Sequence, residues 1–308
     1  MEENTGDGDQ YDVTTWEDRT RFDHLAVWVS RIIVQRWVAL AALIGVLFVA
    51  HPLAIMGTDL VQYPWLIGLW LLTLLIGLLI IRYIRGADPM PTSFQVLVVT
   101  FLLGGAFAGF ALPIESGLQP AFTVIPVIGT AAFLLLVVGP AEELVKWLAV
   151  RLYAYERSDF QTALDGAAYG ATAGLGFGAF ESAKYITQAV AQASTTGEPV
   201  LILAVGGAIG RLLPVPLHVL LTALSGYYLG LAKANPKSYA PIVVKGLLIA
   251  ALLHGTYDTL VTYLPGVVGL GVGAVFIVGI GVVLYRKISR YRQRVTTDES
   301  PKTTTAHS

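Results

Sequence analysis

The stretch VVGPAEELVKWLAV (Val137–Val150) decides how this chain folds, because it places Glu142, Glu143 and Lys146 inside an otherwise apolar segment of membrane-spanning character. A charged side chain at that depth costs at least ~2.5–3.5 kcal/mol on insertion scales, since hydrocarbon solvates it far worse than water does. Two acids and one base also leave one charge uncompensated within the segment. We therefore expect the segment to turn its charged face toward other helices and away from lipid.

The composition is that of a polytopic membrane protein. Of the 308 residues, 55% are hydrophobic and 13% are charged, and the mean hydropathy is +0.66, whereas a soluble domain carries roughly 25% charged residues. The net charge of −1 gives no indication of a nucleic-acid partner, and the absence of cysteine excludes disulfides, thiolate metal sites and a cysteine nucleophile.

The apolar residues come in blocks of about twenty, the length that crosses the core of a bilayer. They predict an all-α membrane bundle with eight transmembrane helices, at 37–57, 65–84, 94–113, 122–150, 163–189, 214–233, 240–263 and 267–286. An additional apolar piece at 200–213 is short for a span and runs into Pro214 and Pro216, which interrupt helical hydrogen bonding. We expect that piece to be a re-entrant or interfacial helix.

The placement of Lys and Arg predicts the topology. Basic residues precede the first span and follow the second, fourth, sixth and eighth, whereas the loops near 51–64, 113–121, 190–199 and 264–266 contain none. Because basic flanks favour the cytoplasm, both termini are predicted to be cytoplasmic. This alternation holds only if the piece at 200–213 does not cross the bilayer.

Three later helices also carry ionisable groups inside their apolar stretches. One holds Glu181, and the other two hold His218 with Thr222 and His254 with Asp258, each pair on one helix face at i,i+4 spacing. At ~1.5 Å per residue, His254 lies about 21 Å, His218 about 22 Å and Glu181 about 24–28 Å above the cytoplasmic ends of their helices. The paired glutamates lie about 12–20 Å above theirs. We therefore expect these groups to meet near the midplane, where two His, three Glu and one Asp are sufficient for a metal site or an acid–base site.

Small residues support this convergence, because glycines let helices approach closely. The predicted helix at 163–189 carries Gly166, Gly170, Gly174, Gly176 and Gly178.

Each polar group also has a purely structural alternative. The glutamate pair and Lys146 would tie helices together as a neutralised cluster, Glu181 would pair with Lys184, and the two imidazoles would bond to backbone groups. Arg211 fits a lipid-headgroup anchor and a site residue equally well. Convergence at one depth favours a functional site for the glutamates and histidines, and leaves Arg211 open.

Four motifs in order, with DGAAYG (Asp165–Gly170) before the second, carry a family resemblance: EELVK (Glu142–Lys146), GLGFGAFE (Gly174–Glu181), HVLLTALSGYYLG (His218–Gly230) and HGTYD (His254–Asp258). Over about 130–260 the chain resembles the PrsW family of intramembrane metalloproteases. That family is similar to the CAAX prenyl endopeptidases and bacteriocin-immunity proteins. This chain departs from the CAAX pattern at Glu181 and Asp258, where that group has a histidine and an asparagine, which argues against prenyl-protein processing.

The resemblance implies an endopeptidase embedded in the lipid bilayer that cuts membrane-anchored protein substrates, as bacterial relatives cut an anti-sigma factor. Three protein ligands with one open position are usual for catalytic zinc. Glu181, His218 and His254 are the expected ligands of a metal, Zn²⁺ first, although a metal-free mechanism in which Glu and His activate water stays open.

The remaining groups have expected roles in peptide hydrolysis, which needs an activated water, a polarised carbonyl and a proton for the leaving amine. Glu142 is the expected general base, with Glu143 supporting it or acting as a ligand, and the two could exchange roles. Asp258 is expected to hydrogen-bond His254, and Lys146 to offset the glutamate charge.

Two other classes of protein remain as alternatives. A secondary transporter or proton-coupled carrier would also place Glu, His and Asp at the midplane, but the chain shows no inverted repeat. A non-catalytic membrane scaffold of the same fold would show a gap in the motifs, and none is missing. The expected organisation is one membrane domain at 31–290 with a catalytic core at 122–263, flanked by disordered cytoplasmic tails at 1–30 and 291–308.

Overall fold

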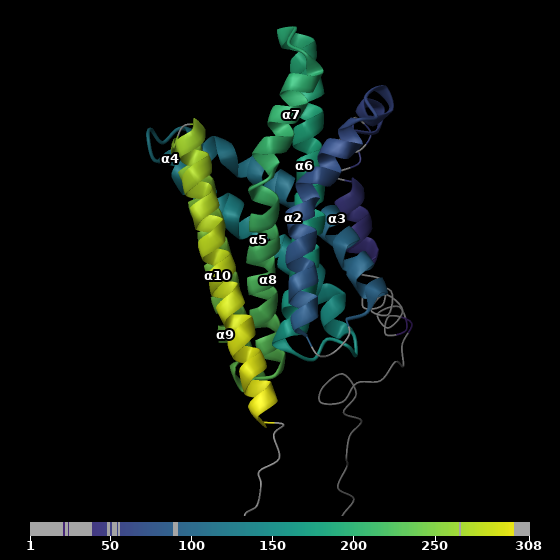
Figure 1. The fold of residues 1–308 in the computed structure, drawn as a ribbon, viewed down its shortest axis with the longest axis vertical. Helices are drawn as coiled ribbons and strands as arrows, with labels where there is room; N and C mark the ends of the chain where they lie inside the picture. Colours follow the sequence, from purple (N-terminus) through teal and green to yellow (C-terminus); the bar gives the residue numbers. More distant parts are fainter. Residues whose placement is uncertain are drawn as a thin grey trace, which may run out of the picture. The chain divides into compact units, whose positions relative to one another are not determined.

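The computed structural model describes residues 21, 24, 39–47, 50, 54, 56–88, 92–264 and 266–298, with side chains up to Gln293. The chain divides into two compact units, residues 1–41 and 42–308, and every helix discussed below lies in the second. The described residues form helices and contain no strand (Figure 1). The predicted all-α bundle is therefore confirmed. In chain order the elements are α2 (Leu66–Ala87), α3 (Phe94–Thr123), α4 (Gly129–Phe133), η1 (Leu134–Val138), α5 (Gly139–Leu152), η2 (Ala154–Glu156), α6 (Ala163–Thr196), α7 (Val200–Arg211), α8 (Pro214–Lys233), η3 (Pro236–Ser238), α9 (Tyr239–Tyr263) and α10 (Gly266–Asp298).

Five helical segments are long and apolar enough to cross a membrane, by length and composition. They are Leu66–Ala87, Phe94–Thr123, Val200–Lys233, Pro236–Tyr263 and Gly266–Gln293. The charged α5, which has 14 residues, and the glycine-rich α6 lie outside this set. The first predicted span, 37–57, is described only in part, and its described residues are helical.

Two loops expected from the sequence are helical instead. The helix α3 continues through Pro113 and Pro120 to Thr123, so that the whole loop expected near 113–121 is helix. In the same way α6 continues to Thr196 and ends at Gly197, whose φ of 76° is the left-handed conformation that glycine adopts most easily. A lack of Lys and Arg indicates which side of the membrane a connection faces, but not where a helix ends. The predicted bounds of these two loops were wrong for this reason.

The segment at 200–213 forms a helix of its own. α7 runs back along the last turns of α6, where Ala204 and Ala208 pack with Ile186 and Ala189. It leads directly into α8, which begins at Pro214 (Figure 1).

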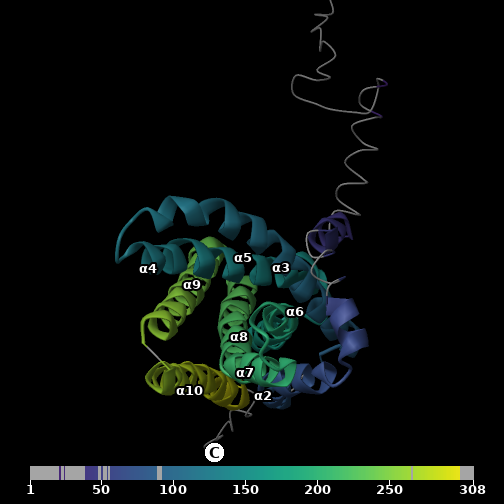
Figure 2. The ribbon, with the colours of Figure 1, turned by 90° about the horizontal axis from the view of Figure 1, so that it is seen from above.

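The glycine-rich α6 lies in the middle of the bundle, in contact with α2, α3, α5, α7 and α8 (Figure 2). Every residue from Ala163 to Ala179 is buried, which is typical of a helix enclosed by other helices and shielded from solvent or lipid. A Cβ atom added at Gly170 or Gly174 would collide with the backbone carbonyl of α8 residue Thr222 or His218. The predicted close approach is therefore confirmed, and it brings His218 against α6.

A second close approach sets the position of α9. A Cβ atom at Gly139 would meet the backbone of α9, and one at Gly255 would meet Leu134 and Leu135 of the π-helical turn η1. Because π-helical turns are rare and often mark functional sites, this turn directly before α5 is notable. The contact places His254, the neighbour of Gly255, opposite the glutamates of α5.

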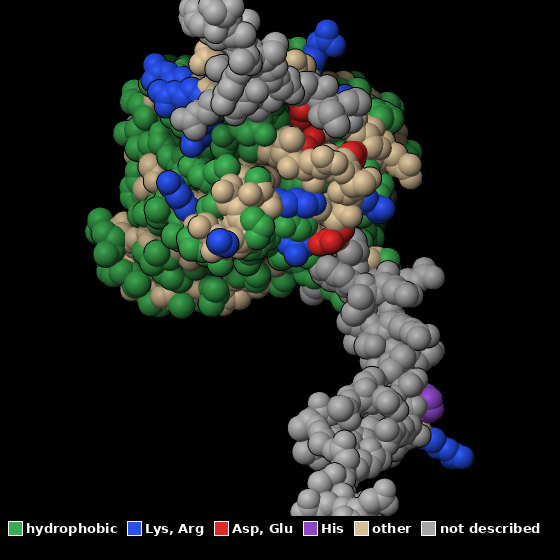
Figure 3. Space-filling model, turned by 90° about the horizontal axis from the view of Figure 1, so that it is seen from below, with side chains coloured by type: hydrophobic (Ala, Val, Ile, Leu, Met, Phe, Trp, Pro, Cys, Tyr) green, Lys and Arg blue, Asp and Glu red, His purple; other side chains and the backbone are tan. Residues whose placement is uncertain are grey.

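The basic connections gather at one end of the bundle. Arg85 of α2 donates a hydrogen bond to the hydroxyl of Thr92, beside the start of α3. The ammonium of Lys233 donates to the carbonyl of Tyr155 at 2.7 Å and so joins the end of α8 to η2, which follows α5. Lys and Arg side chains accordingly appear on the face seen from below (Figure 3). The alternation of basic and non-basic connections along the sequence therefore corresponds to the two opposite ends of the helical bundle.

Candidate active site

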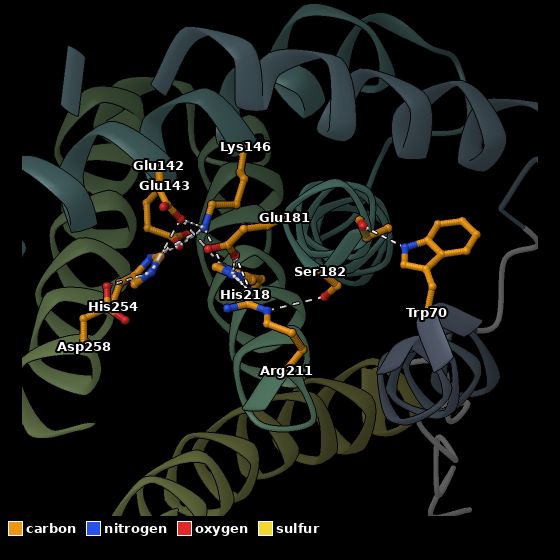
Figure 4. A network of polar contacts seen from close by, with 11 residues as sticks. Trp70, Glu142, Glu143, Lys146, Glu181, Ser182, Arg211, His218, His254 and Asp258 are labelled. Carbon is orange, nitrogen blue, oxygen red and sulfur yellow. Dashed lines mark hydrogen bonds and ion pairs between the residues drawn. The ribbon is translucent and has the colours of Figure 1, made fainter. Parts of the chain in front are cut away.

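The seven side chains singled out by sequence come together on the inner faces of four helices (Figure 4). They are Glu142, Glu143 and Lys146 on α5, Glu181 on α6, His218 on α8, and His254 and Asp258 on α9. Both histidines, Lys146 and the two α5 glutamates are buried. The expected convergence of depths therefore holds in three dimensions.

The ammonium of Lys146 lies at the centre of the cluster. Its Nζ is 2.7 Å from Oε1 of Glu143 and 3.3 Å from Oε2 of Glu142. It also donates to Nδ1 of His218 at 3.0 Å and lies 4.3 Å above the ring of Phe177. The lysine thus neutralises part of the glutamate charge, as expected, and also contacts an imidazole from another helix.

Each histidine is paired with one carboxylate, through opposite ring nitrogens. The Nε2 of His218 lies 2.7 Å from Oε2 of Glu181, and the Nδ1 of His254 lies 2.8 Å from Oε1 of Glu143. Because Lys146 donates to Nδ1 of His218, the hydrogen-bond network assigns the ring proton of His218 to Nε2. A carboxylate that accepts one imidazole N–H fixes the ring and leaves the other nitrogen free to bind.

The other nitrogen of each ring, Nδ1 of His218 and Nε2 of His254, faces Glu142. Oε2 of Glu142 lies 3.6 Å from Nε2 of His254 and 3.9 Å from Nδ1 of His218. Glu142, His218 and His254 form the one group within the described residues whose three donor atoms all lie within 4.8 Å of one another. Glu181, an expected ligand, is not in this group, since its Oε2 bonds Arg211 and His218.

The donor set and its surroundings fit a metal ion. One carboxylate and two imidazoles are a known ligand set of catalytic zinc. Oε2 of Glu143 is buried beside the group without a hydrogen-bond partner, and a buried unsatisfied carboxylate oxygen is costly unless a cation compensates it. The ammonium of Lys146 lies 3.0 Å from Nδ1 of His218 and 3.3 Å from Oε2 of Glu142, so a metal ion bound by these atoms would replace those two contacts of the lysine.

Asp258 lies on the cavity side of His254. Its Oδ2 is 3.4 Å from Nε2 of His254, the same nitrogen that faces Glu142. Glu143 holds the opposite nitrogen. The hydrogen bond to His254 that the sequence predicts for Asp258 is thus made by Glu143.

Arg211, which the sequence left open, belongs to the site. Its guanidinium is buried, forms an ion pair with Glu181 and lies 3.5 Å from Nε2 of His218. It also packs over the ring of Tyr185. In the sequence, the feature that pointed to Arg211 was its position three residues before Pro214, the first residue of the helix that carries His218.

A cavity of about 520 Å³ opens onto the cluster. Glu142, His218, His254 and Asp258 form part of its wall, and further residues of α3, η1, α6, α7, α8, α9 and α10 complete it. Such a volume is in the range of sites that bind small ligands, and it gives water and a short peptide segment access to the buried donors.

Comparisons with known proteins agree with this arrangement. A family model described as PrsW family intramembrane metalloprotease matches residues 92–285, which include every helix of the site. Protease PrsW of Halalkalibacterium halodurans is 31% identical over 166 residues, covering 53% of this chain and 69% of that protein. Protease PrsW of Geobacillus kaustophilus is 34% identical over 120 residues (39% and 47%), and that of Shouchella clausii is 31% identical over 180 residues (57% and 74%). No solved structure matches the chain significantly.

The bundle and its polar cluster are therefore those of a multi-pass membrane protease. Because the match extends over more than half of the sequence, the chain belongs to the PrsW family of intramembrane metalloproteases. The resemblance carried by the four motifs is confirmed, and the transporter and scaffold alternatives lose their support.

Proposed function

We propose that this protein is an intramembrane endopeptidase that hydrolyses peptide bonds of membrane-anchored protein substrates with the assistance of a divalent metal, zinc first. The observation that carries the proposal is the meeting of Glu142, His218 and His254 at the wall of a cavity in a member of this family. Membrane-anchored substrates follow from the location, because the site lies within a bundle whose helices include five segments long and apolar enough to cross a membrane.

The proposed ligands are Glu142 Oε2, His218 Nδ1 and His254 Nε2. This set replaces Glu181 by Glu142, because Glu181 is engaged by Arg211 and His218. Glu143 and Glu181 orient the two rings from behind. When bound, zinc would supply a water of lowered pKa and a Lewis acid for the scissile carbonyl.

The other groups act on the cavity side. Asp258, which lines the cavity beside His254, accepts a proton from the attacking water and returns it to the leaving amine. Lys146 offsets part of the charge of the two glutamates of α5 in the apolar interior.

A metal-free acid–base mechanism is the second candidate, and one observation favours it. The ammonium of Lys146 already occupies the space between Glu142 and the two imidazoles. In that mechanism Glu142 and one histidine activate the water, and the second histidine stabilises the oxyanion.

Metal content separates the two mechanisms. We expect the protein purified in detergent to hold about one zinc per chain by elemental mass spectrometry, and His254→Ala to lose it, because removing one of three ligands typically lowers metal affinity strongly. Glu181→Ala is expected to retain most of the metal, at reduced affinity of about 10–100-fold, since its role is to orient His218.

The matched control is His24→Ala, which removes an exposed histidine outside the site and is expected to retain the metal. Wild-type protein that is folded and monodisperse but holds no metal would exclude the ligand assignment and favour the metal-free mechanism. Loss of metal in Glu181→Ala as complete as in His254→Ala would restore Glu181 as a ligand.

We also propose that both termini are cytoplasmic, since the basic end of the bundle is expected to face the cytoplasm. The chain has no cysteine, so single-cysteine variants report the topology directly. A membrane-impermeant thiol reagent should label Ser194→Cys, near the end of α6, in intact cells, and Lys302→Cys only after lysis. The reverse pattern would invert the topology.

A further inference from the structure

The helix α6 separates two cavities at a single side chain. Phe180 lines the catalytic cavity on one side and a second cavity of about 260 Å³ on the other. The second cavity lies between α2, α3 and α6, with Trp70 and Phe101 in its wall. Phe180 precedes Glu181, the carboxylate that holds His218, so the second cavity begins one residue from the site.

The position of Phe180 is set by a tight helix crossing. A Cβ atom at Gly176 would collide with the Phe101 carbonyl of α3, and one at Gly104 would collide with the Ala173 carbonyl of α6. Phe180 follows Gly176 by one turn. Its side chain therefore stands at the α3–α6 interface just beyond the point where the two backbones touch.

The second cavity offers no free hydrogen-bond donor to a ligand. Its two polar side chains are already satisfied by backbone oxygens, since Trp70 Nε1 donates to Ala179 at 2.8 Å and Thr187 Oγ1 donates to Ala183 at 3.0 Å. Every other lining residue is apolar or glycine. A polar occupant would lose its hydrogen bonds to water, whereas an apolar one gains from burial.

We propose that this second cavity is a specificity subsite that receives one large apolar side chain of the substrate, next to the bond that is cut, with Phe180 as its movable wall. The inference rests on the proposed peptidase function. A single side chain is favoured over a whole lipid because the cavity is smaller than the ~300–1,000 Å³ that typically holds a complete small ligand. It is also favoured by the shared wall with the catalytic cavity, where the peptide backbone would lie.

Opposite changes of cavity size test this assignment. Ala183→Phe fills the subsite, and Phe180→Ala joins it to the catalytic cavity. The probe is a detergent-solubilised bacterial membrane-protein fraction, in which new N-termini are identified by mass spectrometry against a Glu142→Gln background. Val98→Phe is the control, because Val98 lies on α3 but is exposed and lines neither cavity.

Wild-type protein and Val98→Phe should cut where one fixed position beside the cut bond holds a large aliphatic or aromatic residue. In Ala183→Phe the ratio of large to small residues at that position should fall at least about 10-fold, the usual effect of lost apolar contacts in a pocket. In Phe180→Ala the share of tryptophan at that position should rise above that in wild type. If Ala183→Phe does not fold, Ala179→Leu fills the same cavity from the neighbouring turn.

Three outcomes would overturn the proposal in distinguishable ways. No cleavage by wild type above the Glu142→Gln background removes the proposed function, and the subsite with it. Cleavage with the same residue pattern in wild type, Ala183→Phe and Phe180→Ala removes the subsite alone. A co-purifying lipid that is lost in Ala183→Phe while the pattern stays constant makes the cavity a lipid site.

Discussion

Glu142→Gln is expected to abolish peptide cleavage, with a loss of at least about 10²–10⁴-fold in kcat, the range that general acid–base catalysis alone contributes. The substitution keeps the shape of the side chain but removes the negative oxygen that faces both imidazoles. The same loss is expected whether Glu142 binds a metal or accepts the water proton. The measurement is cleavage of the membrane-protein fraction, with folding checked by size-exclusion chromatography.

Two comparisons make this result informative. Glu198→Gln changes an exposed glutamate in the α6–α7 connection and should leave cleavage unchanged. Zinc lost in Glu142→Gln would identify Glu142 as a ligand, and zinc retained in an inactive variant would identify it as the base. Full activity of Glu142→Gln would exclude Glu142 from both roles.

Lys146→Met is expected to cause the largest loss of stability. The ammonium is completely buried and contacts Glu142, Glu143 and His218. Removing one partner of a buried ion pair leaves an uncompensated charge, which typically costs about 3–5 kcal/mol in the free energy of unfolding. The midpoint of denaturation in detergent, without added metal, measures this loss.

The control is Lys237→Met, an exposed lysine in η3, which should unfold at the wild-type midpoint. Zinc should restore part of the stability of Lys146→Met, by about 2.7 kcal/mol at a concentration of 100 Kd, because a cation at the cluster compensates the same carboxylates. Lys146→Met that is as stable as wild type in metal-free buffer would show that the glutamates do not depend on the lysine.

The protein's class and the composition of its site are readable from the sequence alone. Apolar blocks of spanning length predict the helical bundle, and glycines along 163–189 predict the close approach of α6 to its neighbours. Both follow from local rules, since helix rise converts sequence distance into depth and small side chains permit contact of backbones. Those depths also predicted that groups on α5, α6, α8 and α9 would meet.

The helix ends were less predictable. Both unexpected helical stretches, the end of α3 and the end of α6, lack basic residues, and charge placement reports the side of the membrane but not local backbone conformation. The position of α7 against α6 likewise depends on Ala204 and Ala208 finding partners far away in sequence. Local sequence does not encode such packing.

Only the tertiary structure determined which side chains of the site contact one another. Adjacent residues of a helix point about 100° apart, given ~3.6 residues per turn, so the sequence could not tell which of Glu142 and Glu143 faces the cavity. The rotation of α5 against α9 places Glu143 behind His254 and leaves Glu142 facing Nε2 of His254 and Nδ1 of His218. The same packing brings Arg211 of α7 onto Glu181. The sequence therefore determined which groups are buried together, and the packing of the helices determined which atoms meet, because helical spacing fixes the depth of a side chain but not its partner.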